Sequence, residues 1–304
     1  MIIKPRTEPH DLTMFRILNA RMELSENDKR NFINLQKGYL GELKFDEFAE
    51  RQLDDHIPIL NDLLMKHNNS YFQIDSFIIA NGVGNLIDIK NSEGDYIFRD
   101  GQFYPMGSNQ EILNPLGQLD RCVTLLRKSL SIKDCQIPIK PYLAFVNPNF
   151  TLYQAPVHES LIFPTQLNAF MKKLNAGTTR VNGHQTKLIE TLLAAHITKY
   201  PYSKLPAYSF EQLKKGITCC RCQSFSIATT GRKLSCLDCG YEESLIQAVL
   251  RAVDEFRLLF PGERVTTNKI LDWCGRGNIS KKLIWRILKE NFKAVGYGRW
   301  FYYE

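Results

Sequence analysis

Residues 73–91, QIDSFIIANGVGNLIDIKN, contain two apolar runs separated by a turn that is rich in Asn and Gly. Two such runs around a short Asn-Gly turn are typical of a β-hairpin. The first run carries Asp75, and the second carries Asp88 and Lys90. Side chains two positions apart on a strand point to the same face, so Asp88 and Lys90 share a face with their Cα atoms about 6–7 Å apart. The neighbouring strand brings Asp75 alongside them.

Carboxylates on a hairpin of this apolar character need compensation, because burying an unpaired charge is costly. A divalent cation compensates two carboxylates directly and leaves room for waters and phosphate oxygens, which suits Mg²⁺. A nearby lysine can orient a water or neutralise developing phosphate charge. The pattern is therefore physically suited to metal-assisted phosphodiester hydrolysis. The alternative is an exposed Asp88–Lys90 salt bridge with Asp75 at a turn, and the short pattern taken alone favours that alternative.

Two flanking segments strengthen the prediction of a site. In KGYLGELKF (37–45), Gly38 and Gly41 share a helix face, and each costs roughly 1 kcal/mol relative to Ala. Close approach of the helix backbone to a sheet would explain that cost, and Glu42 beside it could reach the same cleft; the alternative is a helix start with a solvated Glu42. Downstream, Gln118 follows Asn114-Pro115 on the first turns of an expected helix. It could hold a lysine or a water, although alone it would be a surface amide.

Four segments in order resemble the nuclease-related domain, NERD, a branch of the PD-(D/E)xK phosphodiesterase superfamily. They are KGYLGE (37–42), QID (73–75), IDIKN (87–91) with Gly94 following, and NPLGQ (114–118), and the resemblance covers about residues 30–150. It implies an α/β (α+β) fold with a restriction-endonuclease-like mixed sheet flanked by helices.

The resemblance also implies roles for the residues. Asp75, Asp88 and Lys90 would form the catalytic centre, with Glu42 as an additional acidic residue and Gln118 in support. Asp75 and Asp88, with the Ile89 carbonyl, would hold Mg²⁺ or Mn²⁺. The family more often has Glu-x-Lys where this chain has Asp88-x-Lys90, so the shorter side chain leaves metal placement and turnover open.

The cysteines predict a second metal site. Cys219-x2-Cys222 and Cys236-x2-Cys239 are separated by thirteen residues, a spacing that supplies four thiolates to one tetrahedral Zn²⁺. The module resembles the zinc ribbons attached to topoisomerases. Cys220 is a weaker candidate ligand. The remaining cysteines are expected to be buried free thiols: Cys122, Cys135 and Cys274.

The last 60 residues have the order helix, helix, helix, hairpin, which is that of a winged helix. Residues 276–304 contain seven Lys or Arg and two Glu, a local excess of five positive charges. The candidate nucleic-acid contacts are Lys281, Lys282, Arg286, Lys289 and Arg299. The alternative is a solvated basic face. Trp285, Trp300 and the tyrosines of this segment are expected in its core.

The chain as a whole has a formal net charge of +7 and a pI of about 8.9, a mild bias toward polyanions. The N-terminus has no apolar signal-peptide region, and no apolar run approaches the ~20 residues that span a bilayer. We therefore expect a protein of the bacterial cytoplasm with no membrane partner. The expected divisions are N-terminal helices (1–35), a NERD domain (36–165), a helical connector (166–215), a zinc ribbon (216–243) and a winged-helix-like domain (244–304).

These features predict a Mg²⁺-dependent nuclease that hydrolyses phosphodiester bonds, with DNA as the preferred substrate and C-terminal modules that bind nucleic acid. The alternative function is a DNA-binding regulator, or a component of a defence or repair complex, with an inactive nuclease-like core. Partner proteins or self-association are left unspecified by the sequence.

Overall fold

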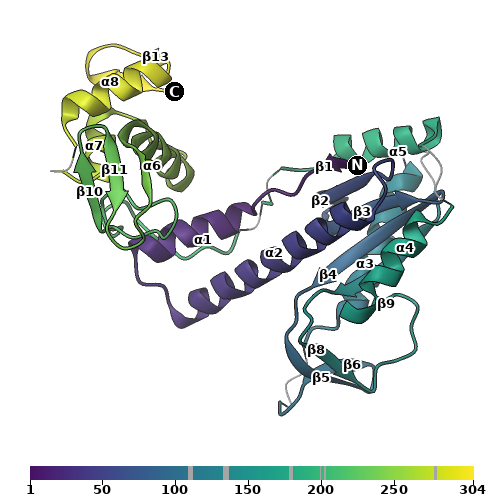
Figure 1. Ribbon diagram of the computed structural model, residues 1–304. Coiled ribbons are helices and arrows are strands. Elements are labelled where there is room, and N and C mark those ends of the chain that lie inside the picture. The colour runs from purple at the N-terminus through teal and green to yellow at the C-terminus, as the bar shows by residue number, and fades with distance from the viewer. Residues whose placement is uncertain (109–111, 133–136, 178–180, 199, 202, 277–278) are drawn as a thin grey trace. The chain divides into compact units, whose positions relative to one another are not determined.

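The computed structural model describes the chain except residues 109–111, 133–136, 178–180, 199, 202 and 277–278, and except the side chains of Ile132 and Arg299. The described residues form two compact units (Figure 1). The first unit contains residues 1–9 and 33–203, and the second contains residues 10–32 and 204–304. The division falls within one helix, α2 (Glu26–Gln52), which Ser25 caps by accepting a hydrogen bond from the Asp28 N–H at 3.2 Å.

The first unit is built on a six-stranded mixed sheet in the order β1-β2-β3-β4-β7-β9. Strands β2, β3 and β4 pair antiparallel, whereas β1 with β2, β4 with β7, and β7 with β9 pair parallel. Its strands are β1 (Ile2–Lys4), β2 (Ile59–His67), β3 (Ser70–Ala80), β4 (Val83–Lys90), β7 (Ile139–Phe145) and β9 (Leu161–Ile162). A smaller sheet lies at one end of the large one (Figure 1). It consists of β6 (Gln102–Pro105), β5 (Gly94–Arg99) and β8 (Phe150–Tyr153).

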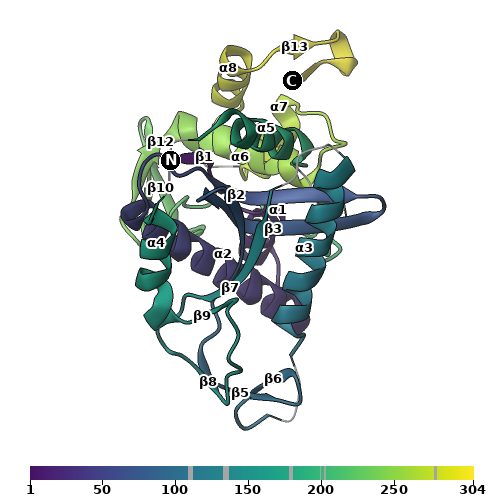
Figure 2. The ribbon, with the colours of Figure 1, turned by 90° about the vertical axis from the view of Figure 1, so that its right-hand side faces the viewer.

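Helices cover both faces of the large sheet, and each face has its own apolar layer. On one face, α2 and α4 (Leu167–Asn175) pack on residues such as Ile87 and Ile89. On the other, α3 (Pro115–Ile132) and α5 (Gly183–Ala195) pack on residues such as Leu86. Figure 2 shows α3 and α4 on opposite sides of the sheet. A mixed sheet flanked by helices was predicted from the sequence, and this prediction is confirmed.

The predicted hairpin at residues 73–91 is formed by β3 and β4. Its two-residue turn consists of Asn81 and Gly82, whose φ angles are +55° and +73°. Positive φ at both central residues is what the right-handed twist of a two-residue hairpin requires, and Asn-Gly adopts it at low cost. Because Ile87 and Ile89 face the α2 side, the alternation of the strand directs Asp88 and Lys90 toward the α3 side.

The second unit combines α1 (His10–Arg21) with the C-terminal segments. A three-stranded antiparallel sheet is followed by three helices and a short hairpin whose strand β14 also bridges Val265. The elements are β10 (Ile227–Thr230), β11 (Lys233–Cys236), β12 (Glu242–Ser244), α6 (Leu245–Leu259), α7 (Thr267–Trp273), α8 (Lys281–Asn291), β13 (Ala294–Val295) and β14 (Tyr302–Tyr303). The described residues also form two 3-10 turns, η1 (Pro164–Gln166) in the first unit and η2 (Gly298–Trp300) in the second.

A buried arginine joins α1 to the rest of the second unit. The Arg21 guanidinium, 1% exposed, forms an ion pair with Glu255 at 2.5 Å and lies 4.0 Å from the centre of the Trp273 ring. It also donates to the carbonyls of Lys214 and Gly216. Residues 10–32 are therefore held within the same core as the C-terminal helices. Within the described part of the chain, no helix has both the length and the apolar character needed to cross a membrane.

Candidate active site and metal centre

Asp75 lies where strands β3 and β4 separate. Their pairing ends at Ser76 opposite Ile87, one position before Asp75 and Asp88 would face each other. Asp75 Oδ2 instead accepts a hydrogen bond from the Ile89 N–H at 2.8 Å. The carboxylate thus takes the place of a missing ladder partner, which anchors it to β4 beside Asp88.

Asp88, Lys90 and Gln118 meet on the α3 side of the sheet. Lys90 Nζ lies 3.1 Å from Asp88 Oδ1 and 2.9 Å from Oδ2, and it donates to Gln118 Oε1 at 3.4 Å. Asp88 Oδ2 is buried and makes no hydrogen bond with the described residues beyond this ion pair. From the sequence, Gln118 on the first turns of α3 could hold a lysine or a water, and in the structure it contacts Lys90.

The negative charges around Asp75 disfavour the ionised form of its carboxyl group. Burial raises the pKa of Asp75 well above its ordinary value, and the neighbouring charges of Asp88 and Glu42 raise it further. For Lys90, burial lowers the pKa, but the charges of Asp88 and Asp75 outweigh it and the pKa is raised. One ammonium therefore faces several acidic groups. Such an excess of negative charge, with an oxygen of Asp88 lacking a hydrogen bond, suits a divalent cation.

Glu42 is held by an arginine that lies in none of the sequence motifs. Arg6, whose side chain is 2% exposed, donates to Glu42 Oε2 at 2.6 Å and to the Asp75 carbonyl at 2.7 Å. It also donates to both oxygens of Asp46, at 2.8 and 3.1 Å. Burial raises the pKa of Glu42, and the charge of Arg6 offsets part of this. Arg6 belongs to residues 1–9 of the first unit, which lie far from every motif in the sequence. No pattern of residue types could therefore have identified it.

The two glycines of KGYLGELKF differ in their surroundings. A Cβ at Gly41 would lie 2.4 Å from Asn91 Cβ, whereas a Cβ at Gly38 would meet nothing within 4 Å. Asn91 also donates to the Lys37 carbonyl at 2.8 Å. The expected close approach is therefore confirmed for Gly41 and wrong for Gly38. The contact docks α2 onto the end of β4, which keeps Glu42 near the hairpin.

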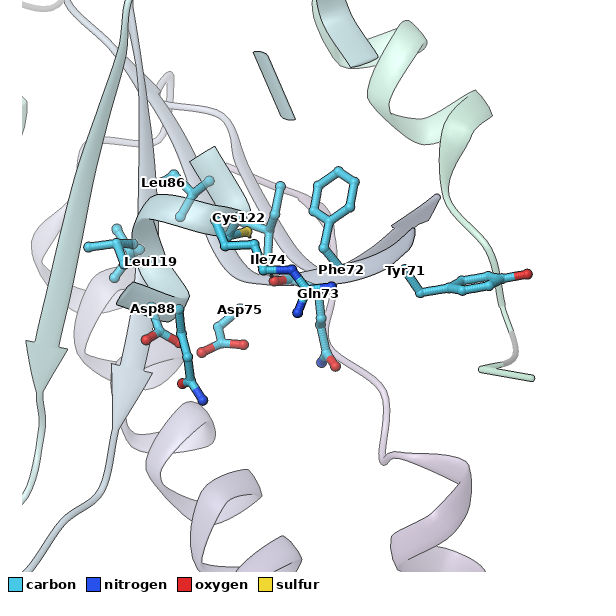
Figure 3. Close-up of a pocket in the computed structure, with 12 residues that line it drawn as sticks. Tyr71, Phe72, Gln73, Ile74, Asp75, Leu86, Asp88, Leu119 and Cys122 are labelled. Atoms are coloured by element: carbon cyan, nitrogen blue, oxygen red, sulfur yellow. Dashed lines mark hydrogen bonds between the residues drawn. The ribbon is translucent and has the colours of Figure 1, made fainter. Parts of the chain in front are cut away.

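Asp75, Asp88 and Gln118 line one pocket of about 260 Å³ between β3, β4 and α3. Figure 3 shows the carboxylates of Asp75 and Asp88 next to each other, with Leu86 and Leu119 above them in this view. Cys122 lines the same pocket and is only half-buried, so the expectation of a buried thiol is wrong for it, although burial raises the pKa of this thiol to about 12. Of the other thiols expected to be buried, Cys274 is 1% exposed, and Cys135 lies outside the described residues.

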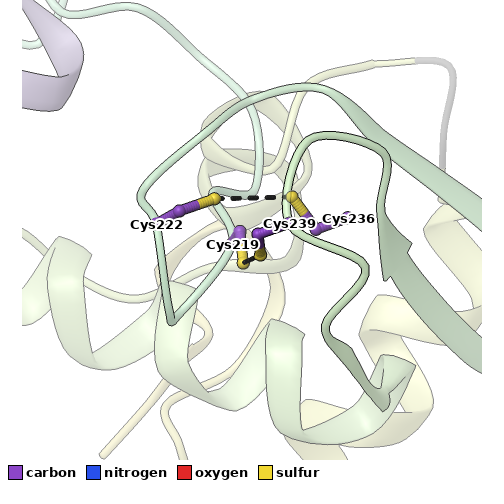
Figure 4. A group of neighbouring side chains, drawn as sticks. All are labelled: Cys219, Cys222, Cys236 and Cys239. Atoms are coloured by element: carbon purple, nitrogen blue, oxygen red, sulfur yellow. Dashed lines mark hydrogen bonds between the residues drawn. The ribbon is translucent and has the colours of Figure 1, made fainter.

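The four predicted zinc ligands converge in the second unit (Figure 4). Their Sγ atoms all lie within 4.8 Å of one another, with 3.6 Å between Cys219 and Cys239 and 3.5 Å between Cys222 and Cys236. Four sulfurs at about 2.3 Å from one Zn²⁺ would be about 3.8 Å apart, so the cluster fits this ion. Each pair of ligands comes from a turn next to the β10-β11-β12 sheet, which supports the expected zinc ribbon. Among the described residues, no cluster of Asp or Glu side chains brings its ligand atoms together as closely as these four cysteines do.

The expected basic face of α8 is exposed. Lys281, Lys282, Arg286 and Lys289 are all solvent-accessible, opposite the buried stripe of Ile284, Ile287 and Leu288. The side chain of Arg299 lies outside the described residues. The expectation that the aromatics are core residues is wrong for Trp285, Trp300 and Tyr297, which are 44%, 60% and 92% exposed. It is correct for Tyr303, at 2%. Trp285 lies between buried residues in the sequence, but the helix turns its side chain away from their stripe toward solvent.

Residues 37–146 match the family model of the nuclease-related domain, NERD. The matched segment contains Glu42, Asp75, Asp88, Lys90 and Gln118, together with strands β2 to β7, helix α3 and the C-terminal part of α2. The chain therefore contains a nuclease-related domain, as the sequence motifs predicted, and the domain indicates a nuclease-related function with a divalent metal and nucleic acid. Neither the curated proteins nor the solved structures gave a significant match.

Proposed function

We propose that this protein is a metal-dependent nuclease that hydrolyses phosphodiester bonds in DNA. The observation that carries the proposal is that Asp75, Asp88 and Gln118 line one pocket inside the nuclease-related domain, and that Lys90 contacts both Asp88 and Gln118. The Asp88–Lys90 pair is not an isolated surface salt bridge, because Asp75 and Gln118 adjoin it and its two side chains are only 20% and 28% exposed.

Asp75 and Asp88, with the Ile89 carbonyl, are the groups that would hold Mg²⁺ or Mn²⁺. When bound, the cation would polarise the scissile phosphate and lower the pKa of a coordinated water. Lys90 orients a water or a phosphate oxygen, and Gln118 keeps the ammonium at that end of the pocket. Glu42 is the third acidic residue of the site. Arg6 links it to Asp75 by donating to the Glu42 carboxylate and to the Asp75 carbonyl.

The second unit supplies nucleic-acid affinity in this proposal. Cys219, Cys222, Cys236 and Cys239 bind Zn²⁺ and fold the ribbon. Helices α6, α7 and α8 with the β13–β14 hairpin act as a winged-helix-like module. Its cations contact phosphates, which gives affinity with little sequence readout: Lys281, Lys282, Arg286, Lys289 and Arg299.

The test is a cleavage assay on the full-length, zinc-loaded protein with plasmid, linear duplex and single-stranded DNA, in Mg²⁺, Mn²⁺ or EDTA. We expect Asp88→Ala to abolish metal-dependent cleavage and Lys90→Ala to slow it by about 10²–10⁴-fold. Asp100→Ala is the matched control, because its side chain is 88% exposed in the same unit and it should cleave like wild type. Undiminished cleavage by a folded Asp88→Ala protein would refute the assignment.

A second function is favoured by one observation. Lys90 contacts both oxygens of Asp88, and Arg6 pairs with Glu42, so two of the three acidic side chains already have a cationic partner. A DNA-binding regulator, or a subunit of a defence or repair complex, could use such a self-neutralised core as a scaffold. In the same assay this function predicts DNA binding by wild type without cleavage in any metal, and no difference between wild type and Lys90→Ala.

A further inference from the structure

An exposed indole occupies the centre of the cationic face of α8. Trp285 is 44% exposed, although large aromatic side chains are usually among the more buried. The apolar side of the same helix is already complete, since Ile284, Ile287 and Leu288 are fully buried. Trp285 therefore contributes little to the core of the second unit, and its position calls for another explanation.

Cations surround this indole at helical spacing. Positions three and four residues away lie next to a given side chain on a helix, and around Trp285 these positions include Lys281, Lys282 and Lys289. Lys289 Nζ lies 5.1 Å from the centre of the indole ring. Beside the ring is a hollow of about 220 Å³ that Lys282 and Arg286 help to line. An aromatic plane, an adjoining hollow and several positive charges thus share one surface.

This combination fits unpaired nucleotides better than a duplex. The faces of bases in a duplex are covered by their neighbours, so an indole can stack without separating stacked base pairs only on a base that has been released from pairing. The lysines would at the same time contact the phosphates on either side of that base. A purely electrostatic duplex contact would use the lysines and leave the indole without a partner.

We propose that α8 binds single-stranded nucleic acid by stacking an unpaired base on Trp285 while Lys281, Lys282 and Lys289 contact its phosphates. The inference rests on the proposed nucleic-acid function and narrows its substrate to DNA with single-stranded character, such as ends, gaps or forks. It assigns the specificity for strand state to the indole and the general affinity to the lysines.

The test measures binding by the full-length, zinc-loaded protein in the Asp88→Ala background, so that no cleavage intervenes. The probes are a fluorescent oligothymidylate of roughly 20 nucleotides and a duplex of the same length, followed by anisotropy. Trp285→Leu removes the stacking plane but keeps apolar bulk, Trp285→Phe retains a ring, and Lys282→Gln removes one charge. Zinc content and the thermal melt of each variant establish that the second unit is folded.

We expect Trp285→Leu to weaken single-strand binding by about 5- to 150-fold and duplex binding by less than about twofold. Trp285→Phe should recover most of the loss. Lys282→Gln should weaken both probes alike and lower the slope of log affinity against log salt by about one. Equal loss on both probes for Trp285→Leu, or no loss on either, would overturn the inference. Binding through Trp285 without cleavage by wild type would refute only the nuclease, whereas cleavage with unchanged binding by Trp285→Leu would refute only this inference.

Discussion

Arg6 offers the sharpest test of how the acidic site is held together. Its guanidinium is 2% exposed and bridges Glu42 and Asp46, whose side chains are 17% and 13% exposed. Arg6→Ala removes a cation that contacts both carboxylates and also removes the donor to the Asp75 carbonyl. The perturbation therefore leaves two buried negative charges uncompensated.

The expected cost is large because the pairs are buried. Removing one partner of a buried, hydrogen-bonded ion pair costs about 3–5 kcal/mol, most of it from the stranded charge. Arg51→Ala is the matched control. Arg51 lies on α2, the helix that carries Glu42 and Asp46, and it pairs with Glu47, with side chains that are 71% and 62% exposed. An exposed pair of this kind contributes less than about 1 kcal/mol. Arg6→Lys should fall between the two, because it keeps the charge but not the planar fork.

The loss should depend on pH in a defined direction. Burial raises the pKa values of Glu42 and Asp46 above their ordinary values, and Arg6 opposes that rise. Without Arg6 both folded-state pKa values move higher still. A carboxyl whose pKa is raised on folding destabilises the protein as pH rises from its unfolded pKa through its folded pKa. The deficit of Arg6→Ala is therefore smallest below about pH 4 and largest near pH 7.

Hydrogen exchange of the β3 and β4 amides measures this deficit locally, because it reports the opening free energy of the first unit without assuming that both units unfold together. It would be combined with urea unfolding followed by circular dichroism at pH 5 and pH 7. If Arg6→Ala loses no more stability than Arg51→Ala at pH 7, or if its deficit does not shrink as pH falls, the reasoning about a buried charge cluster is refuted.

Three further predictions concern other parts of the chain. Gly41→Ala should destabilise the first unit by about 1–3 kcal/mol because its Cβ would lie 2.4 Å from Asn91 Cβ. Gly38→Ala, whose Cβ would meet nothing within 4 Å, should stabilise the unit by about 0.5–1 kcal/mol. Urea unfolding compares the two variants, and equal effects would contradict the close approach of α2 at Gly41. Asp75→Asn should abolish cleavage. Without metal it should also raise the stability of the first unit by about 0.5–2 kcal/mol near neutral pH, because it removes the repulsion of Asp75 with Asp88 and Glu42. A loss of stability in urea titrations would contradict the second expectation. Cys236→Ser should lose stoichiometric zinc, measured by metal analysis, whereas Cys220→Ser should retain it; zinc loss in both would place Cys220 among the ligands.

The sequence predicted what depends on local spacing. The Asn81-Gly82 turn fixes the hairpin, and strand alternation then puts Asp88 and Lys90 on one face. The four zinc ligands follow from two short knuckles, each of which closes within four residues. The turn residues and the two ligands of each knuckle lie a few residues apart, and thirteen residues join the knuckles, so the pattern of residue types is enough to specify these contacts.

Tertiary packing decided the rest. Arg6 reaches Asp46, Glu42 and Asp75 across as many as 69 residues, and only the parallel pairing of β1 with β2 brings its segment to the site. The exposure of Trp285 was likewise hidden, because composition shows that an aromatic residue is present but not whether neighbouring helices leave room to bury it. Gly38 and Gly41 are equivalent in helical spacing, yet only Gly41 meets the end of β4. Spacing thus determined which side chains share a face, whereas the packing of segments distant in the chain decided which of those faces meet.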